Sequence, residues 1–395
     1  MLGFSIPIST ALDSALILLV PLLWLMSAKF GEKFSSIRNN DAARLATAFV
    51  GLICIGILYG NGTIGDRLDM LGRYSHLLLI VLLVPLLREN RNRRRALFGF
   101  MAAVTLTLIL SYLIAFSVIP AGKLFTGTPD DPTVFKLQIT QGLFLAYGAF
   151  AFAVAARFES RPKLRLVFAL LTALSVYNVL FMEIGRSGYL VLGVLVAYFC
   201  FEWLGRRGII IGAAGFLILG TAAYFSSQAL HSRIDIALHQ LASWHPGKPA
   251  GHGNSIGDRL EFYRNSLAII RKHPVFGVGT GGFTQTYAEQ IKGTGMLATP
   301  NPHNQFLLIT VQLGIVGLAA LVYFFFKLWK LAQRLGNNID RNLARGLILL
   351  MVAGNLVNSL MMDHAESLLF ALMAGVLYAG LPPHQPDKGA ISAIT

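Results

Sequence analysis

Residues 88–119 read RENRNRRRALFGFMAAVTLTLILSYLIAFSVI, in which a loop with five arginines is followed by a run of 24 residues without a charged side chain. A helix of this length can cross the hydrocarbon core of a bilayer, which is about 30 Å thick. Similar apolar runs recur along the chain and are separated by short charged loops. Because backbone polar groups inside a bilayer must be satisfied within the segment, the pattern predicts an all-α, polytopic integral membrane protein.

The composition of the whole chain agrees with this fold class. Of 395 residues, 55% are hydrophobic and 13% are charged, whereas soluble domains carry about 25% charged residues. The net charge is +14, and most Lys and Arg lie in alternate loops, as the positive-inside rule requires. Such loops favour anionic membrane lipids as partners, and nucleic-acid binding is not expected.

Eleven apolar spans are expected, and a twelfth if Leu2–Thr10 enters the bilayer. They are Ala11–Ala28, Leu45–Gly60, Tyr74–Leu87, Ala96–Ile119, Val134–Ala156, Leu166–Ile184, Tyr189–Trp203, Ile209–Phe225, His303–Lys327, Gly346–Met361 and Ser367–Leu381. The first run lacks the flanks of a cleaved signal peptide and is expected to be retained. The predicted organisation is a transmembrane bundle (1–225), a long loop domain facing away from the cytoplasm (226–302), C-terminal spans (303–381) and a disordered cytoplasmic tail (382–395).

No pattern in the sequence requires a metal or another cofactor. Cys54 and Cys200 lie within spans and are expected to be buried small apolar residues. His231, Asp235 and His239 share one face of a predicted helix and could hold a metal, but the spacing is common and a solvated helix face explains it more simply.

The stretch Gly257–Gly317 concentrates the polar features. A helix is expected from Asp258, as the cap, to Lys272. Arg259 would lie in its first turn, where a cation opposes the helix dipole, so Arg259 is a better ligand candidate than a plain surface arginine. Arg264 could be either a ligand contact or a surface residue.

A glycine-rich segment follows this helix. Gly277, Gly279 and Gly282 satisfy the string G-x-G-x-x-G, but no strand precedes them and no βαβ unit surrounds them, which excludes a dinucleotide-binding fold. The glycines are expected to permit a tight bend or a close approach of the backbone to a ligand.

His303 is the candidate general base. Asn301 is expected to cap the following span, which places His303 in the first helical turn, where the helix dipole disfavours imidazolium. A neutral imidazole is the form that a general base requires. Gly314 and Gly317 would let another helix pack closely. An interfacial histidine that reaches water is the plainer alternative.

Charged residues at two other span ends complete the set of candidates. Arg186 lies where two spans meet, and ionisable groups at such a depth mark functional sites. A self-neutralising pair with Glu183 is the alternative. Asp363, in the turn before the last span, could orient His303, bind an acceptor hydroxyl, or be an exposed loop charge.

Together, the string R259-L-E-F-Y-R, the segment H273-P-V-F-G277-V-G279-T-G281-G-F, and N301-P-H303-N304-Q-F with Gly314 resemble the O-antigen ligase family. The histidine, ten residues and a glycine match that family's pattern, as does a multi-span bundle with one long loop late in the chain.

The resemblance implies a GT-C-like glycosyltransferase of the bacterial inner membrane that needs no metal and no nucleotide sugar. The donor would be O-antigen glycan on undecaprenyl diphosphate, and the acceptor a sugar hydroxyl of lipid A-core at the periplasmic face. Arg186 and Arg259 would bind the diphosphate, and His303 would take the acceptor proton. Arg264, Asn304 and Asp363 are the candidate substrate contacts.

Three alternatives remain open at this point. An O-antigen polymerase or a protein O-oligosaccharyltransferase would use the same donor. A transporter of lipid-linked glycan would use Arg186 in a translocation path, although the sequence lacks the matching broken spans of an inverted repeat. The glycan, the acceptor sugar and the oligomeric state do not follow from the sequence.

Overall fold

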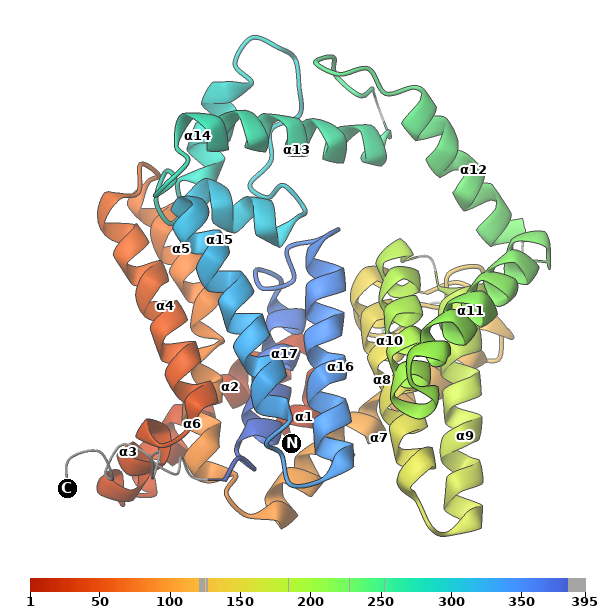
Figure 1. Ribbon diagram of the computed structural model, residues 1–395. Helices are drawn as coiled ribbons and strands as arrows, with labels where there is room; N and C mark the ends of the chain where they lie inside the picture. Colours follow the sequence, from red (N-terminus) through yellow and green to blue (C-terminus); the bar gives the residue numbers. More distant parts are fainter. Residues whose placement is uncertain (121–124, 126, 184, 227, 252, 383–395) are drawn as a thin grey trace.

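The computed structural model describes residues 1–382 except 121–124, 126, 184, 227 and 252. Over these residues the chain folds into helices and forms no β-strand (Figure 1). The expected fold class is therefore confirmed: the protein is an all-α, polytopic membrane protein. Apart from its first residue, the tail expected to be disordered lies outside the described residues.

The helices follow one another along the chain. They are α1 (Leu2–Ser5), α2 (Thr10–Met26), α3 (Phe30–Arg38), α4 (Asp41–Tyr59), α5 (Ile64–Ser75), α6 (Leu78–Leu86), α7 (Asn90–Ala115), α8 (Gln138–Phe158), α9 (Pro162–Tyr177), the π-helical turn η1 (Asn178–Met182), α10 (Arg186–Leu204), α11 (Arg206–Ser226), α12 (Gln228–Ala242), α13 (Ser255–Lys272), α14 (Phe283–Gln290), α15 (Gln305–Ala332), α16 (Asn338–Asn355) and α17 (His364–Tyr378).

Fewer of these helices have the length and hydropathy needed to cross a membrane than the eleven or twelve spans that the sequence predicts. Within the described part of the chain, 8 do so, or 9 if the bent pair α2–α3 counts as one span. Each expected run nevertheless falls on a helix. The difference lies in α2 and α17, which are short, and in α16, which begins with charged residues. Leu2–Thr10 yields only α1, which packs against α7, and adds no spanning helix.

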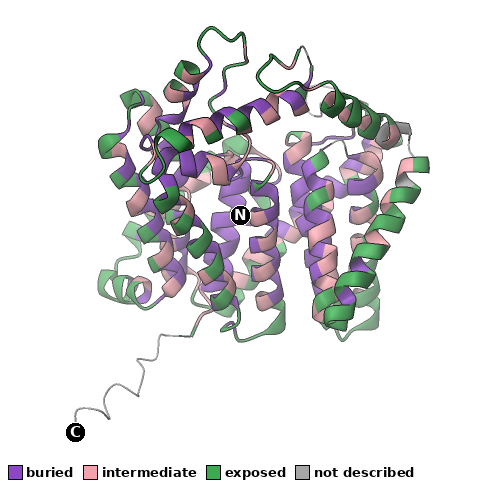
Figure 2. Ribbon diagram, turned by 45° about the horizontal axis from the view of Figure 1, so that its top comes forward, coloured by how far each residue is buried: buried purple, intermediate pink, exposed green. Residues whose placement is uncertain are grey.

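The centre of the bundle is formed by α8 and α17. In α8, 78% of the most apolar stretch of 18 residues is buried inside the protein, whereas in α11, at the rim of the bundle, the share is 12%. Figure 2 shows buried residues in the middle of the bundle and exposed ones around its edge. Gly142 of α8 meets Gly188 of α10, where an added Cβ would lie 3.2 Å from the Gly142 carbonyl carbon. The two helices can therefore pack backbone to backbone.

The two cysteines do not sit where the sequence suggested. Cys54 is exposed and Cys200 is partly exposed. Hydropathy identifies an apolar span but not the face that it turns inward, and in a membrane an outward-facing cysteine meets lipid at little cost. The expectation that both are buried inside the protein was wrong.

The glycine-rich loop between α13 and α14 packs into a break in α15. Gly314 has φ 61° and ψ −158°, which interrupts that helix. A Cβ on Gly314 would lie 2.1 Å from the carbonyl oxygen of Val275 in the loop. In return, the Gly279 N–H donates to the Gln312 carbonyl at 2.7 Å. The loop thus replaces the helical hydrogen bonds lost at the break, and Gly314 admits a loop rather than the helix that was expected.

The same loop also contacts α4. The Thr280 N–H donates to the Gly56 carbonyl at 2.9 Å. Gly279 has φ +83°, and a Cβ there would lie 2.2 Å from the Cα of Gly60. The close backbone approach that the glycines were expected to permit is therefore an approach to neighbouring helices. It fixes the loop domain to the bundle.

α13 lies across the end of the bundle near the starts of α10 and α15 (Figure 1). It contacts α15, α12 and α14. Its residues are thereby held directly above the point where two spanning helices begin.

Candidate functional site

His303 lies immediately before α15, in a backbone conformation with φ +54° that few non-glycine residues adopt. Its N–H donates to Oδ1 of Asn301 at 2.8 Å. The expected cap was wrong: α15 is capped by Asn304, whose side chain accepts from the Leu307 N–H at 3.0 Å. The Asn301 side chain is instead occupied in holding the loop, so His303 lies outside the helix rather than in its first turn.

The loop that carries His303 is bound to the connection between α16 and α17. The Ser359 hydroxyl donates to Oδ1 of Asn301 at 2.7 Å. The Asn304 amide donates to the Leu356 carbonyl at 2.9 Å. These bonds, with the one to the His303 N–H, fix the backbone of the candidate base before any substrate arrives.

α13 contacts His303 from the other side. The Tyr263 hydroxyl donates to the His303 carbonyl at 3.2 Å, and the ring of Phe262 faces the imidazole with centroids 6.1 Å apart and planes at 28°. Burial lowers the pKa of His303, and the charge of Arg259 lowers it further. The neutral imidazole is therefore favoured at pH 7, for reasons other than the helix dipole used in the sequence argument.

Arg259 is half-buried in α13. Because the helix is capped by Asn254 rather than by Asp258, Arg259 lies in the second turn, and the argument from a first-turn cation weakens. Its surroundings are more informative. Burial lowers the pKa of Arg259, Tyr263 opposes that shift, and the charge of Arg186 adds to it. Two cations that the sequence places about seventy residues apart are thus brought within electrostatic range.

Arg186 is the first residue of α10, and its side chain is exposed. The adjoining Ser187 hydroxyl accepts from the Asn358 amide at 2.7 Å, and the Asn358 carbonyl accepts from the Gln305 N–H at 3.1 Å. One asparagine therefore ties the start of α10 to the start of α15. This tie holds Arg186 and His303 at the same end of the bundle.

The alternative of a neutral pair between Glu183 and Arg186 is not formed in the described structure. Glu183 is buried, and its Oε1 accepts from the Gln141 amide. Its Oε2 has no hydrogen-bond partner among the described residues, and no ion pair joins it to Arg186. The Arg186 charge is left for solvent or a ligand.

Arg264 has a structural partner. Its guanidinium pairs with Oε2 of Glu261 at 3.2 Å. The buried Glu261 also accepts from the Trp244 indole at 3.0 Å and from the Gly247 N–H at 2.9 Å. Arg264 therefore helps to hold the connection between α12 and α13.

Asp363 lies at the N-cap of α17, next to Arg73. Arg73 donates to the Met362 carbonyl at 3.1 Å. Burial raises the pKa of Asp363 to about 6, against an opposing effect of Arg73. The charge that acts on the pKa of His303 is Arg259 and not Asp363.

Sequence reasoning missed Arg233, which extends from α12. It is half-buried, and its electrostatic neighbours are Tyr189, Asp131 and Arg186. Burial lowers the pKa of Arg233, Tyr189 and Asp131 oppose that effect, and Arg186 adds to it. No spacing rule relates a loop helix to the start of a distant span, so this third arginine near Arg186 had no signal in the sequence.

Two members of the histidine stripe of α12, His231 and Asp235, form a pair. His231 Nε2 lies 3.0 Å from Oδ2 of Asp235, and Tyr224 stacks on the imidazole with centroids 4.5 Å apart. Across the residues that the structure describes, no three His, Cys, Asp or Glu side chains come together as metal ligands.

Comparisons with known proteins bear on this site. A protein of Haemophilus influenzae described as "Uncharacterized protein" is 27% identical over 146 residues, which is 35% of this chain and 36% of that protein. The match thus spans about a third of the relative's length. A chain from a structure titled "Structural coordination of polymerization and crosslinking by a peptidoglycan synthase complex" has 21% identity and a TM-score of 0.46, covering 86% of this chain and 95% of its own.

A family model described as O-Antigen ligase matches residues 170–322, which include Arg186, Arg259 and His303 but not Asp363. The family resemblance is thereby confirmed for residues 170–322, which are less than half of the chain: over these residues this multi-pass membrane protein is similar to the O-antigen ligase family.

Proposed function

We propose that the protein transfers O-antigen glycan from undecaprenyl diphosphate to a sugar hydroxyl of lipid A-core, at the periplasmic face of the bacterial inner membrane. His303 removes the acceptor proton, and Arg186 and Arg259 bind the diphosphate. The basic loops at the end of the bundle opposite α13 support this orientation. The long loop domain, 226–302, then lies in the periplasm and the tail, 382–395, in the cytoplasm.

The observation that carries this proposal is a histidine with a fixed backbone that lies within electrostatic range of the half-buried Arg259. The backbone of His303 is fixed by Asn301 and Tyr263, while Arg259 lowers the pKa of its ring. A base must be neutral to accept a proton, and a fixed base loses little entropy on reaching the transition state.

The arginines support a diphosphate leaving group. Arg186 and Arg259 repel one another across the site, and a bound diphosphate would relieve that repulsion. Charge develops on the leaving oxygen as the glycosidic bond breaks, and guanidinium groups already in place stabilise it without reorganisation. We assign the half-buried Arg233 to the same electrostatic surface.

The reaction is written as one direct displacement. The acceptor O–H bond breaks and its proton passes to His303. The oxygen forms a bond to the anomeric carbon, while the bond from that carbon to the diphosphate oxygen breaks and its electron pair leaves with the diphosphate. One displacement inverts the anomeric centre. No nucleotide sugar and no metal takes part in these steps.

The remaining candidates receive different roles. Asp363, with a pKa of about 6, is proposed to bind the acceptor hydroxyls. The exposed side of the Arg264 guanidinium remains available to the glycan. Both ends of the Asn304 amide are already bonded, so we assign it to positioning His303 rather than to direct substrate contact.

An O-antigen polymerase or a protein O-oligosaccharyltransferase would use the same base and the same diphosphate site. The two activities differ from the ligase only in the acceptor. A transporter would instead need Arg186 to line a path through the bundle, whereas the candidate residues gather at one end of it.

The products of an in vitro reaction separate these functions. Purified full-length protein would be mixed with lipid-linked glycan and lipid A-core, without ATP and with a chelator. We expect glycan on lipid A-core. Longer lipid-linked chains would instead assign a polymerase, glycan on an added acceptor protein an oligosaccharyltransferase, and flux across a proteoliposome without transfer a transporter.

A further inference from the structure

A groove between α8, α9 and α10 lies apart from the candidate site. Two adjoining cavities of about 120 and 720 Å³ share Ala153, Thr172 and Phe199 in their linings. The inner cavity has an entirely apolar lining. The outer one is bordered by Arg157 and Arg165 at the end of the bundle opposite α13 (Figure 1).

The length of the groove is close to the hydrocarbon thickness of one leaflet of a bilayer. Val176 lines its inner end and Arg165 its mouth, and these residues are separated by about 16 Å of helix rise on α9. This is roughly half of the hydrocarbon core of a bilayer, which is about 30 Å thick. A ligand that fills it has an apolar part no longer than an ordinary acyl chain and a head at the membrane surface.

The arginines at the mouth lack acidic partners of their own. The two acids closest to the mouth in sequence are already engaged: Glu159 pairs with Arg161 at 3.0 Å, and Glu202 pairs with Arg345 at 3.1 Å. In the described part of the chain, neither Arg157 nor Arg165 forms an ion pair.

Trp203 lies at the same mouth. The Arg157 guanidinium stands over its ring at 5.9 Å and over the ring of Phe158 at 5.5 Å. Tryptophan is the residue most typical of the headgroup level of a membrane. Two guanidinium groups without an acidic partner, one of them against an interfacial indole, form a receptor for a phosphate at that level.

We infer that this groove binds an anionic glycerophospholipid of the leaflet opposite the candidate site, with its phosphate between Arg157 and Arg165 and one acyl chain along the alanine-lined floor. Such a lipid would hold α9 against α8 and α10. The inference does not depend on the proposed transferase reaction, because the mouth is about 25 Å along α10 from Arg186.

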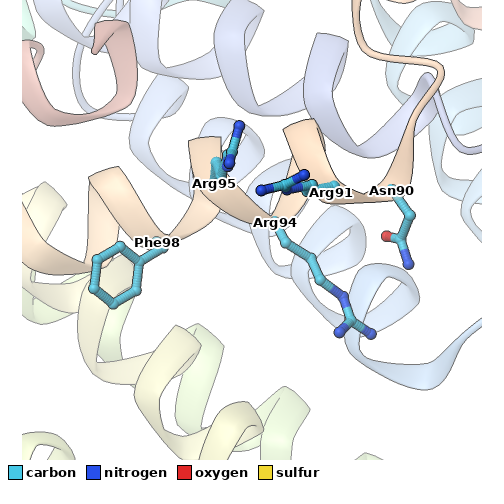
Figure 3. Close-up of a pocket in the computed structure, with 5 residues that line it drawn as sticks. All are labelled: Asn90, Arg91, Arg94, Arg95 and Phe98. Carbon is cyan, nitrogen blue, oxygen red and sulfur yellow. The ribbon is translucent and has the colours of Figure 1, made fainter.

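A second basic surface of the protein supplies a control. Arg91, Arg94 and Arg95 project from the start of α7 with Phe98, and all of the lining belongs to that one helix (Figure 3). This surface also carries several positive charges, but its lining comes from α7 alone and not from between helices.

The test uses delipidated full-length protein titrated with phosphatidylglycerol, with retained lipid counted by native mass spectrometry and Tm followed in parallel. We expect tight retention and a raised Tm. Phosphatidylcholine with the same chains, and glycerol 3-phosphate without chains, should give neither. Equal retention of both lipids, or an equal effect of glycerol 3-phosphate, would overturn the inference.

Substitutions at the mouth and in the floor of the groove test whether the lipid binds there. Arg157→Ala with Arg165→Ala should weaken phosphatidylglycerol binding roughly 25-fold, at about fivefold for each arginine. Ala153→Phe, which keeps both charges but fills the groove, should also lose the lipid. Arg94→Ala with Arg95→Ala should keep it. Loss in this control equal to that in the Arg157 and Arg165 variant, or retention in Ala153→Phe, would contradict the assignment.

Discussion

The two sides of the candidate site are built differently. His303 is held by hydrogen bonds from its own loop, from the α16–α17 connection and from α13. Arg186 is exposed at the start of α10, and the hydrogen bond to Asn358 is made by its neighbour Ser187. Under the proposed function, this difference corresponds to a base that is fixed in advance and a phosphate-binding side that is completed when the donor binds.

Removal of the base should have the largest effect. We expect His303→Ala to reduce kcat about 10²–10⁴-fold with little change in donor binding, because the side chain acts on the acceptor proton. Steady-state transfer to lipid A-core, with donor affinity measured separately, checks this. His273→Ala, an exposed histidine at the end of α13, is the matched control and should be near wild type. Parallel losses in both variants would refute a special role for His303.

Substitutions of Arg259 and Arg186 should differ in their effect on transfer, because Arg259 is half-buried and Arg186 is exposed. Arg259→Ala should lower kcat about 10²–10³-fold, since a cation in a partly desolvated site acts strongly on developing charge. Arg186→Ala should cost less, about 10–100-fold, and more of that loss should appear in the KM for the donor. Arg271→Ala, in the last turn of the same helix, serves as the control. A larger loss in kcat for Arg186→Ala than for Arg259→Ala would reverse the comparison.

The smallest effect should come from substitution of Asn301, whose side chain holds the loop that carries His303. Asn301→Ala leaves the His303 N–H and the Ser359 hydroxyl without their shared acceptor. We expect kcat to fall about tenfold, together with a loss of about 1–3 kcal/mol in unfolding free energy. Transfer rates and thermal unfolding measure the two quantities. An unchanged kcat in a destabilised protein would show that the loop does not position the imidazole.

Hydropathy and helical periodicity are local properties, and they located the helices correctly. Every expected apolar run falls on a helix, because a span in a bilayer satisfies its own backbone. Both expected caps were wrong. Asn254 rather than Asp258 caps α13, and Asn304 rather than Asn301 caps α15, because the Asn301 side chain accepts from the Ser359 hydroxyl. The positions of residues within the loops depend on those contacts too.

Long-range backbone packing had no local signature either. The glycine-rich loop enters the break at Gly314, and Arg233 meets the start of α10 from a helix of the loop domain. In contrast, Arg186, Arg259 and His303 were singled out by residue type at unusual positions. The structure gathers these three at one end of the bundle, although their roles remain proposals.

The central claim is that a neutral His303, kept neutral by burial and by Arg259, accepts the proton. The most direct measurement is the pH dependence of kcat/KM for wild type and Arg259→Gln, each relative to its own maximum. The pKa of His303 lies below its usual 6.5, so wild-type activity should be flat near pH 7 and fall only below about 6.5.

Removing the Arg259 charge should raise the pKa of His303 and move this acid limb to higher pH. Arg271→Gln should leave the limb in place, and Asp363→Asn should retain it even though the pKa of Asp363 is also near 6. The account is contradicted if the limb disappears in Asp363→Asn, or if it stays at the wild-type pH in Arg259→Gln.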